Sequence, residues 1–134
     1  MRKVIYVAHP FQGKPENVQK VEEIIIDLVR LYPDYVFYSP LHATGFYYFE
    51  KSYEEGMKDC IAVLNRCDEL WLCPGWEESR GCNIEFEYFT RQGRPVRYVA
   101  DILKEANHEQ VERQTNKRKD NVQKRQMQIL PSRC

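Results

Sequence analysis

The chain has 134 residues, of which 43% are hydrophobic and 30% are charged, and 20 basic side chains balance 20 acidic ones. These values are typical of one soluble globular domain with a core of its own. They exclude a membrane-spanning protein, because no apolar run approaches the ~20 residues that a spanning helix needs. The apolar run at residues 4–8 is also too short for a signal peptide, so we expect a cytoplasmic protein that does not bind membranes.

The first half of the chain predicts two strands around one helix. Residues 3–8 are β-branched or aromatic on both faces, as in a central parallel strand. The Pro/Gly-rich stretch 9–15 predicts a loop. Residues 16–32 repeat apolar side chains at three- and four-residue spacing, which predicts an amphipathic helix. A second strand is expected at 34–39, followed by an unusually aromatic loop at 41–50.

The second half continues the alternation. Ser52 and Glu55 form the capping-box pattern that begins a second helix. A buried strand is expected at 68–73, a third helix after Gly81 and a fourth strand at 94–100. Strands that alternate with helices predict a three-layer α/β fold, Rossmann-like or flavodoxin-like, with a parallel sheet and helices on both faces.

The end of the chain differs in composition from the rest. Residues 113–134 hold seven basic side chains and one acidic one, whereas residues 1–112 hold 13 basic and 19 acidic ones. We therefore predict an α/β domain at 1–112 and a basic, polar tail at 113–134. The tail has too few apolar residues to bury much surface, so it is a solvated helix, a partner-dependent segment or disordered. Because the domain before it is acidic, we expect no nucleic-acid partner.

Three loops leave the carboxyl edge of the predicted sheet, at 9–14, 39–50 and 74–81, and ligands of open α/β sheets bind at that edge. One loop is rich in Gly and Pro, one is aromatic, and one carries Ser79 and Gly81 ahead of a helix. This inventory suits a nucleotide, with phosphate at the helix start and the base against aromatic rings. The sequence lacks both GxGxxG and GxxxxGK[ST], so it supports neither NAD-dependent redox chemistry nor ATP hydrolysis.

Metal and disulfide chemistry find little support in the sequence. The five cysteines include no CxxC pair, and neither they nor the three histidines have the spacing of a zinc site. We expect reduced, packed thiols and no bound metal.

Several motifs carry a resemblance to a known family. The pattern Ser79-x-Gly81-x-x-x-Glu85, after a strand that begins at Asp68, resembles the nucleoside 2-deoxyribosyltransferase superfamily, which includes the deoxyribonucleoside 5′-monophosphate N-glycosidases. Further segments look like the small phage and bacterial branch of that superfamily: AHPxxG (8–13), SPLHA (39–43), YEEGMxxC (53–60), CDELWL (67–72) and GWEESRG (75–81). The similarity spans roughly residues 3–100 and omits the tail.

The resemblance implies cleavage or transfer at the N-glycosidic bond of a nucleoside or nucleoside 5′-monophosphate, without a metal or organic cofactor. Glu85 occupies the position of the glutamate that attacks the anomeric carbon, which splits one difficult step into two. Ser79 lies where the monophosphate hydrolases bind phosphate and the nucleoside transferases usually carry an aspartate, which favours a nucleotide substrate and hydrolysis. Asp59 is one residue out of register with the family's acidic, base-contacting residue. The resemblance also implies a homo-oligomer, a dimer or larger, with sites near subunit contacts.

The residues by themselves leave other interpretations open. Glu85 is also typical of a solvated first-turn residue, Ser79 of a helix cap, and Asp59 of a helix surface. The same loops also suit a non-catalytic module that binds or senses a nucleotide. The predicted catalytic residues are Glu85 and Asp59, and the predicted substrate-binding residues are His9, Pro10, Gly13, His42, Trp76, Ser79 and Gly81.

Overall fold

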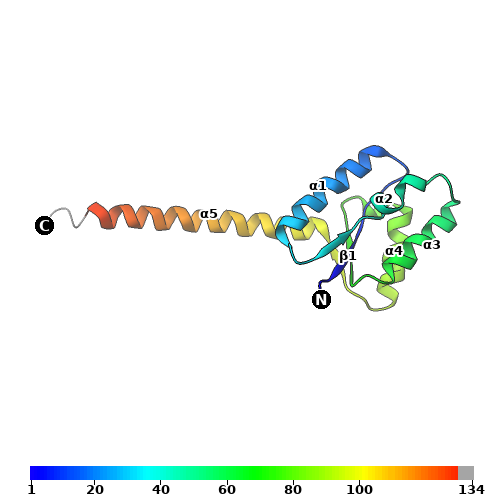
Figure 1. Cartoon of the computed structure of the whole chain (residues 1–134). Coiled ribbons are helices and arrows are strands. Elements are labelled where there is room, and N and C mark those ends of the chain that lie inside the picture. The colour runs from blue at the N-terminus through cyan, green and yellow to red at the C-terminus, as the bar shows by residue number, and fades with distance from the viewer. Residues whose placement is uncertain (130–134) are drawn as a thin grey trace. The chain divides into compact units, whose positions relative to one another are not determined.

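A computed structural model describes residues 1–129 of the chain, which divides into two compact units, Met1–Asp101 and Ile102–Cys134. The first unit contains all of the strands that the structure describes (Figure 1). Its sheet has four strands in the order β2-β1-β3-β4, all parallel, which confirms the predicted α/β class. The strands are β1 (Val4–Ala8), β2 (Val36–Tyr38), β3 (Glu69–Leu72) and β4 (Val96–Tyr98).

The two central strands carry the core because they are apolar on both faces. Tyr6 and Leu70 pack on one face, against a cluster that includes Leu64 and Phe89. The alternate residues of these strands, among them the fully buried Trp71, point to the opposite face. Figure 1 shows β1 between α1 on one side and α3 and α4 on the other. The helices of this unit are α1 (Pro15–Leu31), α2 (Pro40–Ala43), α3 (Tyr53–Leu64) and α4 (Arg80–Arg91), with 3-10 turns η1 (Gly45–Tyr47) and η2 (Trp76–Glu78).

The expected aromatic loop at 41–50 is wrong in its first half, because α2 and η1 lie there. The Ser39 side chain caps α2 by accepting a hydrogen bond from the His42 N–H at 3.4 Å. Pro40 follows at the first helical position, where a missing N–H costs nothing. The capping serine and the proline were both visible in the sequence and together specify a helix start.

Other boundaries shift as well: β2 covers only 36–38 of the expected 34–39, and β4 begins at Val96 and not at 94. The third helix begins at Arg80 and not after Gly81, because the Ser79 hydroxyl accepts a hydrogen bond from the Cys82 N–H at 3.3 Å and caps the helix. The last strand ends at Tyr98, and the expected strand residues beyond it already belong to the next helix, α5.

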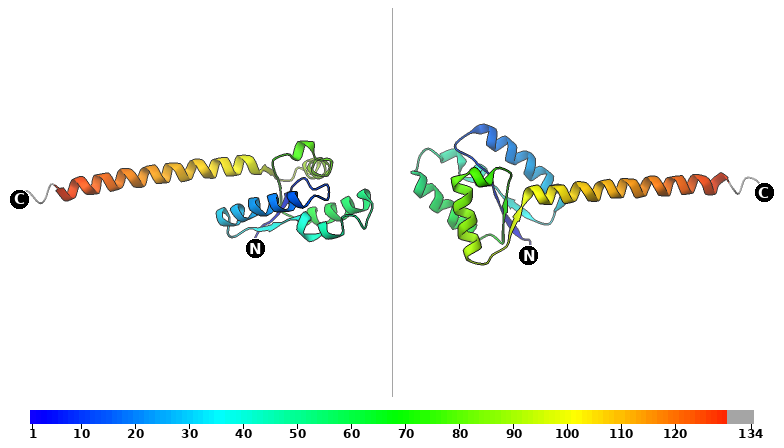
Figure 2. Two further views of the ribbon diagram at one scale, coloured as in Figure 1. Left: turned by 90° about the horizontal axis from the view of Figure 1, so that it is seen from above. Right: turned by 180° about the vertical axis from the view of Figure 1, so that it is seen from behind.

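Helix α5 runs over Val99–Ile129, so it passes from the first unit into the second. It includes the part of the predicted basic tail that the structure describes, and residues 130–134 of that tail lie outside the described residues. Every described side chain from Glu112 to Lys124 is exposed. Within residues 1–129, no helix is both long enough and apolar enough to cross a membrane. Figure 2 gives two further views of these elements.

Candidate functional site

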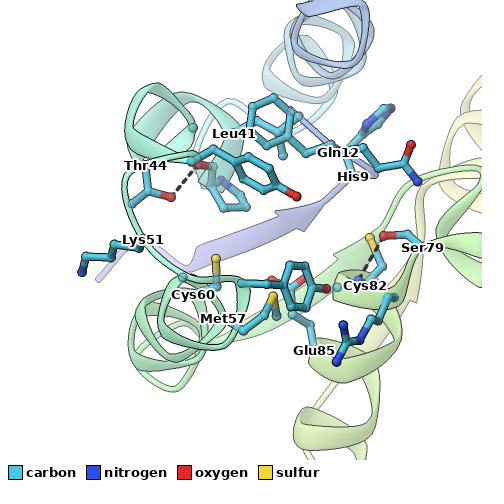
Figure 3. Close-up of a pocket in the computed structure, with 18 of the residues that line it drawn as sticks. His9, Gln12, Leu41, Thr44, Lys51, Met57, Cys60, Ser79, Cys82 and Glu85 are labelled. Atoms are coloured by element: carbon cyan, nitrogen blue, oxygen red, sulfur yellow. Dashed lines mark hydrogen bonds between the residues drawn. The ribbon is translucent and has the colours of Figure 1, made fainter. Parts of the chain in front are cut away.

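A cavity of about 450 Å³ lies at the carboxyl edge of the sheet (Figure 3). Its volume falls in the range of about 300–1,000 Å³ that is typical of small-molecule sites. The three loops that the sequence placed at this edge all contribute to its wall, so their predicted convergence is confirmed. The loop residues that line it include His9, Phe11 and Gln12 after β1, Leu41, Thr44, Tyr47, Tyr48 and Phe49 after β2, and Ser79 after β3. Helix α4 adds Arg80, Gly81, Cys82 and Glu85, and α3 adds Tyr53, Met57 and Cys60.

Glu85 is the buried carboxyl group of this cavity. It projects from α4, lines the cavity and is only 5% exposed. Burial raises the pKa of Glu85 from its ordinary value of 4.5 to about 7, and the nearby Tyr6 hydroxyl opposes that rise. No cation among the described residues pairs with it. Its charged form is therefore costly here, which distinguishes Glu85 from a solvated first-turn residue.

Two tyrosine hydroxyls near Glu85 have no hydrogen-bond partner among the described residues. One belongs to Tyr6 on β1 and the other to Tyr53, the first residue of α3, and both oxygen atoms are buried. The Tyr6 hydroxyl is close enough to Glu85 to affect its pKa, yet their geometry falls outside that of an ordinary hydrogen bond. A buried unpaired hydroxyl costs about 1–3 kcal/mol. Tyr53 lines the cavity, so its hydroxyl is available to a ligand, whereas Tyr6 does not line the cavity.

The start of α4 offers positive potential to the same cavity. The N–H groups of Arg80 and Gly81 have no acceptor among the described residues, and the helix dipole adds to their effect. The Arg80 guanidinium stacks over the Tyr53 ring, 4.6 Å from its centroid. A Cβ on Gly81 would lie 3.3 Å from the Tyr53 hydroxyl oxygen, so glycine is what allows this hydroxyl to approach the backbone. This corner suits an anionic group such as phosphate.

His9 lines the cavity as a neutral side chain. It is 8% exposed, and burial lowers its pKa. Its Nδ1 lies 2.8 Å from the Pro10 carbonyl oxygen, which accepts only, so Nδ1 carries the proton and donates it. The Nε2 atom of His9 is then left as an acceptor.

The cysteine thiols of the cavity are poor nucleophiles. Burial raises the pKa of Cys60 to about 11 and that of Cys82 to about 12. Both thiols are therefore neutral near pH 7, and the thiolate is the reactive form. Neither thiol is therefore an activated nucleophile at neutral pH.

Asp59 lies beside the cavity wall and is not part of it. Its Oδ2 atom accepts hydrogen bonds from Lys51 Nζ at 2.6 Å and from the Tyr47 hydroxyl at 3.3 Å. Lys51 and Tyr47 do line the cavity. The Lys51 ammonium group holds the pKa of Asp59 below its ordinary value.

Only some of the predicted site residues lie together. The structure brings His9, Ser79, Gly81 and Glu85 together at the cavity. His42 and Gly13 line a second, more open hollow, where His42 Nε2 lies 2.8 Å from Glu22. Neither Pro10 nor Trp76 lines the cavity.

Trp76 and Gly13 have contacts that explain their positions. Trp76 packs against Phe86 and Tyr98, with ring centroids 4.9 and 5.9 Å apart, and so covers the edge of the sheet. Gly13 has φ +69°, and a Cβ there would overlap the ring of Phe49, which lines the cavity. Gly13 therefore shapes the cavity through Phe49.

Sequence reasoning missed several wall residues. Tyr53, Met57 and Cys60 follow one another at four- and three-residue spacing on α3, so they share one face of that helix. The stripe was visible, but apolar residues at this spacing are also what a core face requires. Lys51 and Arg80 gave no pattern that separates them from ordinary surface charges.

Comparison with known proteins gives a family over most of the chain. Residues 3–98 match the family described as a domain of unknown function, DUF4406. The chain belongs to this family. The matched region of the DUF4406 domain contains all four strands and every residue that lines the cavity. A search of curated proteins found no match.

Within residues 1–129, no group of three or more His, Cys, Asp or Glu side chains is arranged to hold a metal ion.

Proposed function

We propose that this protein breaks the N-glycosidic bond of a nucleoside or nucleoside 5′-monophosphate, with Glu85 as nucleophile, and passes the sugar to water or to a second base. The observation that carries the proposal is a glutamate that is 5% exposed, lines a ligand-sized cavity and has no cationic partner among the described residues. The resemblance of the Ser79 to Glu85 motif to the nucleoside 2-deoxyribosyltransferase superfamily supports the same role.

The proposed reaction has two steps. A carboxylate oxygen of Glu85 bonds to the anomeric carbon, while the electron pair of the glycosidic bond leaves with the base nitrogen, which takes up a proton. Water or a second base then displaces the glutamate ester and restores the carboxylate. The N–H groups of Arg80 and Gly81 and the Ser79 hydroxyl are suited to hold a 5′-phosphate.

The test is a chromatographic assay for free base. The protein is incubated with a panel of nucleosides and 5′-monophosphates, with and without an acceptor base, beside Glu85→Gln. We expect wild type to release base and Glu85→Gln to lose about 10³-fold or more in rate while still binding ligand. Full activity in Glu85→Gln would refute this mechanism. A new nucleoside formed only with the acceptor base would identify a transferase.

The second candidate is a module that binds or senses a nucleotide without turnover. At a pKa of about 7, a part of the Glu85 side chains is protonated at neutral pH, and this neutral form donates a hydrogen bond to a ligand but does not attack carbon. Tight nucleotide binding by calorimetry, with no base released from any substrate, would select this candidate.

A further inference from the structure

The turn that follows β1 contains a residue that its backbone conformation does not favour. The Lys14 N–H donates to the Phe11 carbonyl oxygen at 3.0 Å, which closes a β-turn. The two central residues, Gln12 and Gly13, have φ +55° and +69°, and a type I′ turn is the type with positive φ at both positions. In the described part of the chain, Gln12 is the one non-glycine residue with positive φ. Type I′ turns favour Asn, Asp or Gly at its position.

The side chain of Gln12 is free to bind a ligand. It is exposed and lines the cavity, and its amide has no hydrogen-bond partner within residues 1–129. The turn is held by other groups, because the Asn17 Nδ2 atom also donates to the Phe11 carbonyl oxygen, at 2.8 Å. Gln12 therefore takes up a costly backbone conformation and adds no hydrogen bond to the fold. Backbone conformations of this kind cluster at functional sites.

Hydrogen-bond donors from two loops lie on one side of the cavity. Figure 3 shows the amide end of Gln12 on the same side as Ser79, with Lys51 on the opposite side. The Ser79 hydroxyl accepts from the Cys82 N–H, so its own proton remains for a ligand. The unpaired N–H groups at the start of α4 follow directly after Ser79. This side of the cavity therefore suits a group that consists of acceptors, as the oxygens of a phosphate do.

The position of Glu85 indicates which part of a nucleotide reaches these donors. Gly81 and Glu85 are four residues apart on α4, so they share a face and are separated by about 6 Å along the helix. If the anomeric carbon meets Glu85, this length matches a sugar whose 5′ end points to the start of α4. An amide can present its oxygen or its NH2 group to a ligand, and a phosphate selects the NH2 group.

We propose that the Gln12 amide donates a hydrogen bond to the 5′-phosphate of the substrate and makes the cavity select nucleoside 5′-monophosphates over nucleosides. The inference rests on the proposed function, because it names the phosphorylation state of the substrate for the same cavity. It also gives a reason for glutamine in this turn. Asparagine fits a type I′ turn better, but its amide ends one methylene group short of the position that the Gln12 amide reaches.

The test measures binding by calorimetry in the Glu85→Gln protein, so that turnover does not interfere. The ligands are the 5′-monophosphates of deoxyadenosine, deoxyguanosine, deoxycytidine and thymidine, each beside its nucleoside. Gln12→Met keeps the length of the side chain and removes the donor. We expect it to weaken monophosphate binding about 10-fold, the lower range for a hydrogen bond to a charged group because Gln12 is exposed, and to leave nucleoside binding unchanged. The matched control Gln19→Met, on an exposed residue of α1 outside the cavity wall, should change neither.

Gln12→Asn separates ligand binding from a role in the fold. Because asparagine suits the left-handed conformation, we expect this variant to raise the melting temperature by about 2 °C or more and to weaken monophosphate binding as Gln12→Met does. A melting temperature that falls together with the affinity would assign Gln12 to the fold and overturn the inference. Equal binding of monophosphate and nucleoside by the parent protein, a preference that survives Gln12→Met, or an equal loss of both ligands would also overturn it.

The outcomes separate this inference from the proposed function. Base release by the wild-type protein, together with a monophosphate preference that Gln12→Met does not change, refutes the role of Gln12 and leaves the reaction. A preference that depends on Gln12, with no base released from any substrate, refutes the reaction and retains the role of Gln12. Failure of all four nucleotides and their nucleosides to bind refutes both.

Discussion

Replacing Glu85 with glutamine is expected to stabilise the fold, and more at high pH than at low pH. The pKa of Glu85 is about 7 in the folded protein against an ordinary value of 4.5, so the folded state binds the proton more tightly than the unfolded chain. The stability that the protonated side chain contributes is complete below about pH 4.5 and is lost as the pH rises through about 7. Glutamine is neutral at every pH and avoids this loss.

The size of the effect follows from the interval between the two pKa values. At about 1.4 kcal/mol per pH unit, the ionised carboxylate costs about 3 kcal/mol at pH 8.5 and less than about 1 kcal/mol at pH 5. Any difference in packing between glutamate and glutamine is the same at both pH values. The change in the stability gain of Glu85→Gln between pH 5 and pH 8.5 therefore reports the charge alone.

The assay is urea unfolding of wild type and Glu85→Gln at pH 5 and pH 8.5. The matched control is Glu87→Gln, on the same helix with a side chain that is 66% exposed, for which we expect no pH-dependent gain. An equal gain for Glu85→Gln at both pH values, or a loss that deepens at pH 8.5, would show that burial does not penalise this carboxylate. The electrostatic part of the site assignment would then fail.

Three further predictions use other features of the same unit. The value of kcat/KM should rise with pH, with a midpoint near 7, because Glu85 must lose its proton to attack carbon. Tyr6→Phe should move that midpoint upward, because the Tyr6 hydroxyl lowers the pKa of Glu85. A midpoint below pH 5, with kcat/KM taken at each pH from rates over substrate concentrations up to saturation, would contradict this. Gly13→Ala should cost about 1–2 kcal/mol in urea unfolding because φ is positive there, and should weaken ligand binding through the displaced Phe49. Deleting residues 113–134 should leave the melting temperature within about 2 °C of the wild-type value and the rate of base release unchanged, because the described side chains from Arg113 to Lys124 are exposed. A large fall in either quantity would contradict this and assign the tail a structural role.

The sheet was predictable because its signals are local and strong. Central strands that are buried on both faces have few polar residues, and β1 and β3 show this pattern directly. The short helix α2 was harder to predict, because four residues are too few for an apolar period and only its cap distinguishes it from a loop. The end of β4 was missed because Val96 and Tyr98, which are typical of strands, are followed directly by the buried Val99, which belongs to α5.

The candidate site was predictable where backbone topology determines it. Parallel strands bring their carboxyl ends to one edge, so the meeting of the loops that carry His9 and Ser79 followed from the predicted parallel pairing. That Lys51 and not Asp59 lines the cavity did not follow, because it depends on how the two bonded side chains pack. That choice is made by side-chain packing, which the spacing of residues in a sequence does not contain.

A second buried glutamate, Glu69 at the amino end of β3, shows how the environment of Glu85 differs from that of a structural carboxylate. Glu69 is 7% exposed, and both of its oxygens are engaged: Oε2 lies 3.0 Å from Lys3 Nζ, and Oε1 accepts from Trp71 Nε1 at 3.1 Å. Such a carboxylate is structural, so Glu69→Gln should lower stability by breaking the ion pair, opposite in sign to Glu85→Gln. Glu85 has comparable burial without those partners, and two unpaired hydroxyls lie near it. This contrast supports the proposed role of Glu85, because buried polar groups without a partner are rare in folded proteins and cluster at functional sites.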